Sequence, residues 1–139
     1  MRNMLVVASI LAVVTVGAMA QADRPDPRAG EYRAWMQSIP PAVRSLTANI
    51  NGKMGDMAAA DADKLDDTFK QIEDFWGQRN VQDAVAFTQT ARKALTAISK
   101  DAKAGNTDAA LADLKTLQST CGGCHMAHRD GSAGSFSIK

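Results

Sequence analysis

Apolar side chains recur every three to four residues along most of this chain, from about residue 31 to residue 129. This spacing puts them on one face of an α-helix, whereas a half-buried strand would alternate apolar and polar residues. Breaks in the pattern near Asn51-Gly52, residues 77–80 and Gly105-Asn106-Thr107 divide the region into four amphipathic segments. Four such helices with short connections and no strand pattern predict an all-α fold, an antiparallel four-helix bundle.

The helical period predicts four helices, over residues 31–51, 58–76, 81–104 and 108–129. Pro40 and Pro41 interrupt the first, and because a proline lacks the backbone amide, we expect a kink or a break into two segments there. Gly52 and Gly105 are expected to end the first and third helices in the left-handed conformation. The inward positions of the first two helices are predicted to be Tyr32, Trp35, Met36, Ile39, Val43, Leu46, Ile50, Ala62, Leu65, Phe69, Ile72 and Trp76.

The last predicted helix carries the stretch Cys121-Gly122-Gly123-Cys124-His125 on its apolar side. Cys-x-x-Cys-His is the attachment signature of c-type haem. Two thiols at this spacing can form thioethers with the two vinyl groups of one porphyrin edge, and the next imidazole can bind the iron axially. We therefore predict one covalently bound haem c, with Cys121 and Cys124 as its anchors and His125 as the proximal iron ligand.

Three other interpretations of the motif stay open from the sequence. A thioredoxin-like redox pair would need a βαβ context, which the helical pattern does not offer. A zinc site would take His125 and His128 as its other ligands, with four ligands crowded into eight residues. Cys121 and Cys124 are the only cysteines, so no further thiol is available, and a structural disulfide between them is the third alternative.

The N-terminus has the pattern of a secretory signal peptide over residues 1–20. Arg2 precedes an apolar run over residues 4–16, and small residues follow, with cleavage expected after Ala20 or Ala22. An uncleaved membrane anchor is the alternative, but the run is shorter than the ~20 residues of a spanning helix. We expect export to the periplasm, the oxidising compartment where bacterial haem attachment takes place. Residues 21–30 are predicted to be a flexible leader and residues 130–139 a flexible tail.

The charge balance is neutral once the signal peptide is removed. Of the 16 Lys and Arg residues one is Arg2, which leaves 15 basic against 15 acidic side chains. A nucleic-acid-binding protein would show a basic excess or stripe, so no nucleic-acid partner is expected. The second predicted helix has an acidic outer face, best interpreted as solvated, with docking of a basic partner as the alternative. Its carboxylates are Asp61, Asp63, Asp66, Asp67, Glu73 and Asp74.

An exported four-helix pattern with the motif close to the C-terminus resembles the cytochrome c′ family, the class II c-type cytochromes. The resemblance covers residues 31–129 as a helix pattern, and its specific part is the motif together with Arg129. Family members often have a basic residue four positions after the histidine, so the resemblance implies that Arg129 lies near the haem; a favourable helix dipole explains it equally well. Gly122 and Gly123 depart from the family, and each destabilises a helix by about 1 kcal/mol relative to alanine.

The family also implies two alternatives for the sixth iron ligand. In one branch the site is open, five-coordinate and high-spin, and binds NO or CO. In the other, a methionine of the first helix binds the iron, and the protein transfers electrons. Met36 is the candidate here, with Met54 and Met57 weaker; Met126 and His128 share the helix of His125 and cannot reach the opposite face of the haem. The alternative for each of these methionines is a side chain that fills the core.

We therefore expect an exported monohaem c-type cytochrome that carries single electrons and is not an enzyme. The alternative is a five-coordinate, cytochrome c′-like protein that binds NO or CO. A haem peroxidase would need a distal acid–base group, and no histidine remains to supply it. The expected partners are redox proteins of the periplasm, and because family members are often dimers, a homodimer is a further option.

Overall fold

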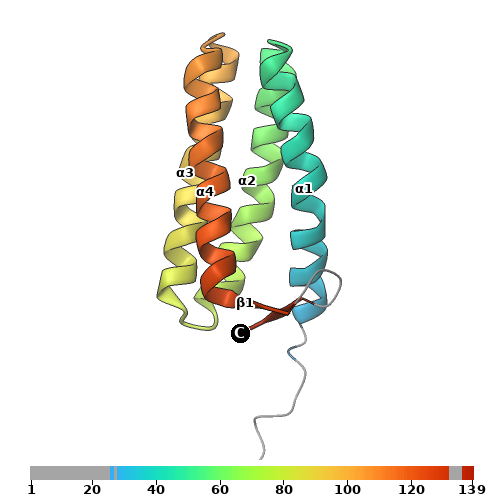
Figure 1. Ribbon diagram of the computed structural model, residues 1–139, viewed down its shortest axis with the longest axis vertical. Helices are drawn as coiled ribbons and strands as arrows, with labels where there is room; N and C mark the ends of the chain where they lie inside the picture. The colour runs from blue at the N-terminus through green and yellow to red at the C-terminus, as the bar shows by residue number, and fades with distance from the viewer. Residues whose placement is uncertain (1–25, 27, 132–135) are drawn as a thin grey trace, which may run out of the picture.

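Four long helices make up most of the computed structural model, which describes residues 26, 28–131 and 136–139. They are α1 (Ala29–Asn51), α2 (Gly55–Gly77), α3 (Gln82–Lys103) and α4 (Thr107–His128). Each helix runs antiparallel to the next, and the four pack side by side as a bundle (Figure 1). The prediction of an all-α four-helix bundle is confirmed, and every predicted helix end lies within three residues of the observed one. Residues 1–20, the predicted signal peptide, lie outside the described residues.

The core follows the predicted apolar faces. All five inward positions predicted for α2 are buried, and α1 buries Ile39, Leu46 and Ile50. Removing one such side chain from water contributes about 1.5–3 kcal/mol, so these stripes hold the helices together. Phe75 is also fully buried, although the sequence did not single it out; it lies three positions after Ile72 and packs against Tyr32 at a centroid distance of 4.4 Å. None of the described helices is long and apolar enough to cross a membrane.

Pro40 and Pro41 do not divide the first helix, so of the two outcomes expected there, a kink or a break into two segments, the break is wrong. The helix α1 continues through both prolines to Asn51. Both prolines are exposed, whereas Ile39 and Leu46 on either side of them are buried in the core. The packing of these flanking residues holds the chain helical across a position where local preference would end the helix.

The ends of the helices agree only in part with prediction. Gly105 has a φ of +75° and ends α3 in the left-handed conformation, as expected. Gly52, by contrast, has a right-handed φ of −76°, and the left-handed residue of that turn is Lys53, with a φ of 55°. The turn before α3 likewise places Asn80 at a φ of 57°. The amide nitrogen of Met54 then donates to the Asn49 carbonyl at 2.9 Å, which closes the first turn.

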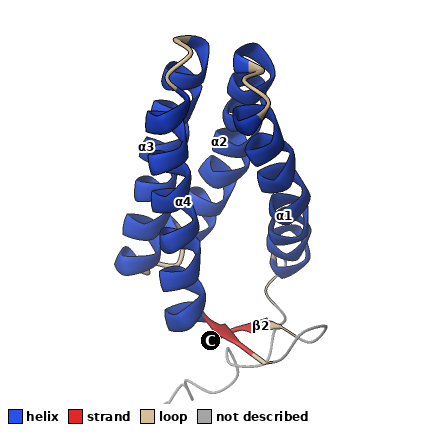
Figure 2. Cartoon of the chain, turned by 45° about the horizontal axis from the view of Figure 1, so that its top comes forward, coloured by secondary structure: helices blue, strands red, loops and turns tan. Residues whose placement is uncertain are grey.

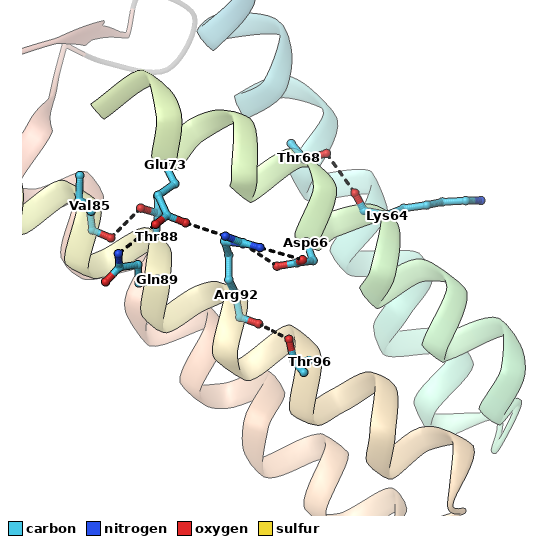
Figure 3. Close-up of polar contacts among 9 residues, drawn as sticks. All are labelled: Lys64, Asp66, Thr68, Glu73, Val85, Thr88, Gln89, Arg92 and Thr96. Carbon is cyan, nitrogen blue, oxygen red and sulfur yellow. Dashed lines mark hydrogen bonds and ion pairs between the residues drawn. The ribbon is translucent and has the colours of Figure 1, made fainter. Parts of the chain in front are cut away.

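Ion pairs join α2 to α3 along the acidic face of α2. The Arg92 guanidinium donates to Asp66 at 2.9 Å and to Glu73 at 2.8 Å, and Gln89 donates to the other Glu73 oxygen (Figure 3). Asp61 accepts hydrogen bonds from the Ser45 hydroxyl and the Asn49 amide of α1, both at 2.7 Å. Much of the acidic face therefore ties helices together within the chain.

The segments that flank the bundle are partly ordered. Asp26 forms an ion pair with Arg79, so the end of the predicted flexible leader is attached to the turn after α2. At the other terminus, β1 (Arg129–Asp130) pairs antiparallel with β2 (Ser137–Ile138), directly below the end of α4 (Figure 2). Ile138 packs against the core. Part of the predicted tail over residues 130–139, residues 132–135, lies outside the described residues, and its flexibility stays a prediction.

Candidate functional site

The cysteine–histidine motif occupies the last turns of α4, near the lower end of the bundle in Figure 1. Cys121, Cys124 and His125 are spaced i, i+3 and i+4, and a helix presents such positions on one face. Cys124 is buried, while Cys121 and His125 are half-buried. All three side chains line the same cavity, so the structure brings the predicted haem-binding residues together.

This cavity has a volume of about 390 Å³. All four helices contribute to its wall, with α1 and α4 supplying the most residues. Helices α1 and α4 pack together less closely than the pairs α1–α2, α2–α3 and α3–α4, and this leaves space between them. Cofactor sites typically have volumes of ~300–1,000 Å³ and apolar walls. The apolar lining here consists of Met36, Ile39, Pro40, Val43, Phe69, Ile72, Phe87 and Leu117.

The environment of the two thiols favours the protonated form. Burial raises the pKa of Cys121, and burial together with the charges of Cys121 and Asp83 raises the pKa of Cys124 to about 11. A reactive redox cysteine has a lowered pKa, usually at a helix N-terminus or beside a cation. Cys121 and Cys124 instead lie near the C-terminus of α4, where the helix dipole disfavours a thiolate. These surroundings argue against a thioredoxin-like pair.

The two histidines of α4 have different surroundings. Burial, and then the positive charge of Arg129, lower the pKa of His125, so its imidazole is neutral at neutral pH, the form that binds a metal ion. His128 instead contacts Asp83 of α3, with 2.9 Å between Nε2 and Oδ2, and its ring lies 5.1 Å from that of Trp76.

The different surroundings of His125 and His128 also bear on the zinc alternative. A zinc site would need both imidazoles and both thiols within bonding distance of a single metal ion. Within residues 26, 28–131 and 136–139, no group of three or more His, Cys, Asp or Glu side chains is placed to hold a metal ion. The described structure therefore does not bring the four candidate zinc ligands, Cys121, Cys124, His125 and His128, together around one position.

Met36 is the methionine that the structure brings to the motif. It lines the cavity from α1, while His125 lines it from α4. Met54 and Met57 are 43% and 55% exposed, and Met54 lines a separate, smaller cavity of about 160 Å³ around the α1–α2 turn. Met126 is 79% exposed. Among the described residues, Met36 is thus the one methionine of the cavity wall.

Arg129 does not line the cavity. It begins β1, it is exposed, and its guanidinium carbon lies 4.1 Å from the centroid of the Phe136 ring. It influences the site through its charge, which lowers the pKa of His125. The position of Arg129 near a haem, which the family resemblance implies, stays a prediction.

Two features of the site were not predicted from the sequence. Phe87 of α3 reaches the cavity beside the motif, and a Cβ atom on Gly123 would lie 2.9 Å from the Phe87 ring. The glycine pair in the motif was the available signal, since a helical glycine often permits close packing. Arg44 and Gln118 also line the cavity, from α1 and α4. Neither residue belongs to the Cys-x-x-Cys-His motif or to the repeating apolar positions of its helix, so the sequence did not indicate that it would line the cavity.

Comparison of the chain with protein-family models, with curated proteins and with solved structures finds no match. The interpretation of the site therefore depends on its own residues and their geometry.

Proposed function

We propose that this protein is an exported monohaem c-type cytochrome, similar to the cytochromes c′, which carries single electrons between redox proteins of the periplasm. The observation that carries the proposal is the convergence of Cys121, Cys124 and His125 on one apolar cavity that Met36 lines from the facing helix. The pattern of a signal peptide over residues 1–20 supports export.

The residues present suit a covalently held haem. Two protonated thiols three positions apart can each add to a vinyl group, and a neutral imidazole on the same helical face can bind the iron. The apolar wall, which includes Ile39, Phe69 and Phe87, would exclude water from a porphyrin. When bound, the haem iron supplies the one-electron redox chemistry, and the protein sets its potential through axial ligation and burial.

Met36 decides between the two candidate functions. A thioether bound to the iron stabilises the reduced state and suits an electron carrier. If Met36 only fills the core, the sixth position stays open, and the protein binds NO or CO in the manner of a five-coordinate cytochrome c′. The apolar side chains of Ile39, Val43 and Phe69, which line the same cavity, favour this alternative because they would cover a haem face without binding iron.

The lining of the cavity bears on the peroxidase alternative. A peroxidase needs an acid–base side chain on the haem face opposite the proximal histidine. Among the described residues that line the cavity, Arg44 is the one ionisable side chain apart from Cys121, Cys124 and His125, and His128 is held by Asp83.

The attachment of haem is tested on the mature chain, residues 21–139, expressed with a c-type maturation system. We expect the denatured protein to keep its haem through acid–acetone extraction and to show the pyridine haemochrome spectrum of two thioethers. Cys124→Ser should retain one thioether and give a shifted haemochrome band. A wild-type chain with no haem, or with haem that extracts freely, contradicts the proposal.

The sixth ligand is tested by absorption spectra of both oxidation states. With Met36 on the iron we expect low-spin spectra, a weak methionine–iron charge-transfer band in the oxidised protein, and slow CO binding. Met36→Ala should be high-spin and bind CO readily, whereas the matched variant Met54→Ala should behave as wild type. A high-spin wild-type protein would support the gas-binding alternative, and a low-spin Met36→Ala variant would exclude Met36 as the ligand.

A further inference from the structure

The polar side chains of the cavity wall differ in whether they have a hydrogen-bond or ion-pair partner within the chain. The Thr88 hydroxyl donates to the Val85 carbonyl at 2.8 Å, and the Thr120 hydroxyl donates to the Thr116 carbonyl at the same distance. Arg44, by contrast, has no hydrogen-bond or ion-pair partner within the described part of the chain, and its side chain is exposed. It is therefore a free cation at the solvent edge of an apolar cavity.

Among the residues that the structure describes, Arg44 is also the one Lys or Arg side chain that lines the cavity. A ligand that fits such a site has a large apolar body and an anionic group at the edge that faces water. A carboxylate is the group that a guanidinium binds best, through two parallel N–H···O bonds.

Given the proposed function, on which this step rests, the ligand is a haem whose carboxylates are its propionates. The vinyl and propionate groups lie on opposite edges of the porphyrin. With the vinyl edge held by Cys121 and Cys124 on α4, the propionate edge points away from these cysteines, and α1 forms the facing wall of the cavity. We propose that Arg44 binds a haem propionate and so fixes the propionate edge at the mouth of the cavity.

The family resemblance implies only that Arg129 lies near the haem. Arg129 follows the motif closely in sequence, but its guanidinium stacks on Phe136 outside the cavity wall. Arg44 is 77 residues before Cys121 in the chain, and only the packing of α1 beside α4 brings it to the cavity. The residue that neutralises the propionate therefore comes from the first helix.

The test uses the holoprotein of wild type, Arg44→Gln, Arg44→Lys and Lys115→Gln, each first shown to carry covalently bound haem. Lys115 is exposed on α4 and does not line the cavity, so its variant removes the same charge without touching the proposed contact. Two properties are measured: the propionate-bending band in the resonance Raman spectrum, which reports hydrogen bonding to the propionates, and the reduction potential.

We expect Arg44→Gln to shift the propionate band and to lower the reduction potential, because an unneutralised carboxylate stabilises ferric iron. The ratio of reduced to oxidised protein at a fixed potential should fall about threefold, or ~28 mV at 59 mV per tenfold change. Arg44→Lys should lie between this variant and wild type. If the band and potential of Arg44→Gln match those of Lys115→Gln, the assignment of Arg44 is wrong although haem is bound. A wild-type chain without haem would instead overturn the proposed function and this inference with it.

Discussion

The two glycines of the motif are adjacent in the same helix but have different surroundings, and this predicts opposite effects for the same substitution. A Cβ atom on Gly122 would meet no atom within 4 Å. A Cβ atom on Gly123 would lie 2.9 Å from Cε1 and 3.4 Å from Cζ of the Phe87 ring. Alanine at position 122 therefore changes only the backbone, whereas alanine at position 123 also displaces a side chain of the cavity wall.

The magnitudes follow from these contacts. Alanine is favoured over glycine inside a helix by about 1 kcal/mol, so Gly122→Ala should stabilise the protein by up to that amount. Gly123→Ala gains the same term but overpacks the α3–α4 contact, which typically costs about 1–3 kcal/mol. We expect Gly123→Ala to destabilise the protein by about 1 kcal/mol, so that the two variants differ by roughly 2 kcal/mol.

The assay is chemical denaturation of wild type, Gly122→Ala and Gly123→Ala, all in the same haem-bound state, followed by far-ultraviolet circular dichroism. An unchanged m-value with a shifted midpoint reports stability alone. Phe87→Leu supplies the control, because a shorter side chain makes room for the new methyl group. In that background, Gly123→Ala should recover most of the helix-propensity gain.

Two results would refute this reasoning. Equal midpoints for Gly122→Ala and Gly123→Ala would show that Phe87 moves aside without a free-energy penalty. An unchanged effect of Gly123→Ala in the Phe87→Leu background would show that the ring is not the cause of the difference.

Further predictions concern the helix contacts and the surface. Gly55→Ala should lower the free energy of unfolding by about 1–3 kcal/mol in urea titrations, because its Cβ would collide with the Ala102 carbonyl oxygen, whereas Gly77→Ala, with no atom in reach, should not. Burial alone would raise the pKa of Glu73, but hydrogen bonds from Arg92 and Gln89 lower it. Its pairing therefore stabilises the fold above the ordinary glutamate pKa and is lost as pH falls through the lowered value. Arg92→Met should thus cost about 1 kcal/mol at pH 7 and less below pH 4, measured by urea titration; an equal loss at both pH values would contradict the pairing. Electron exchange with small inorganic oxidants should depend only modestly on salt, since 15 acidic side chains balance 15 basic ones without the predicted signal peptide and before haem propionates are counted; steep dependence in stopped-flow rates would point to docking at the acidic face of α2.

The sequence by itself determined the helices and the placement of the motif on one helical face. Apolar side chains at a spacing of three to four residues specify a helix and its buried face, and the stripe through Leu65, Phe69 and Ile72 lies in the core as predicted. The spacing of Cys121, Cys124 and His125 likewise places them on one face of any helix that contains them. These properties depend on neighbours within a few turns, so the linear order of residues carries them.

Only the tertiary structure decided which distant residues meet at the motif. The continuation of α1 through Pro40 depends on the burial of Ile39 and Leu46, which outweighs the local preference of proline. The tertiary structure decided that Arg44, and not Arg129, is the arginine of the cavity wall, and it placed Met36, the methionine already favoured from the sequence, on the same wall. The ring of Phe87 against Gly123 is a contact of the same kind. Such contacts are set by the packing of whole helices, which no short stretch of sequence specifies.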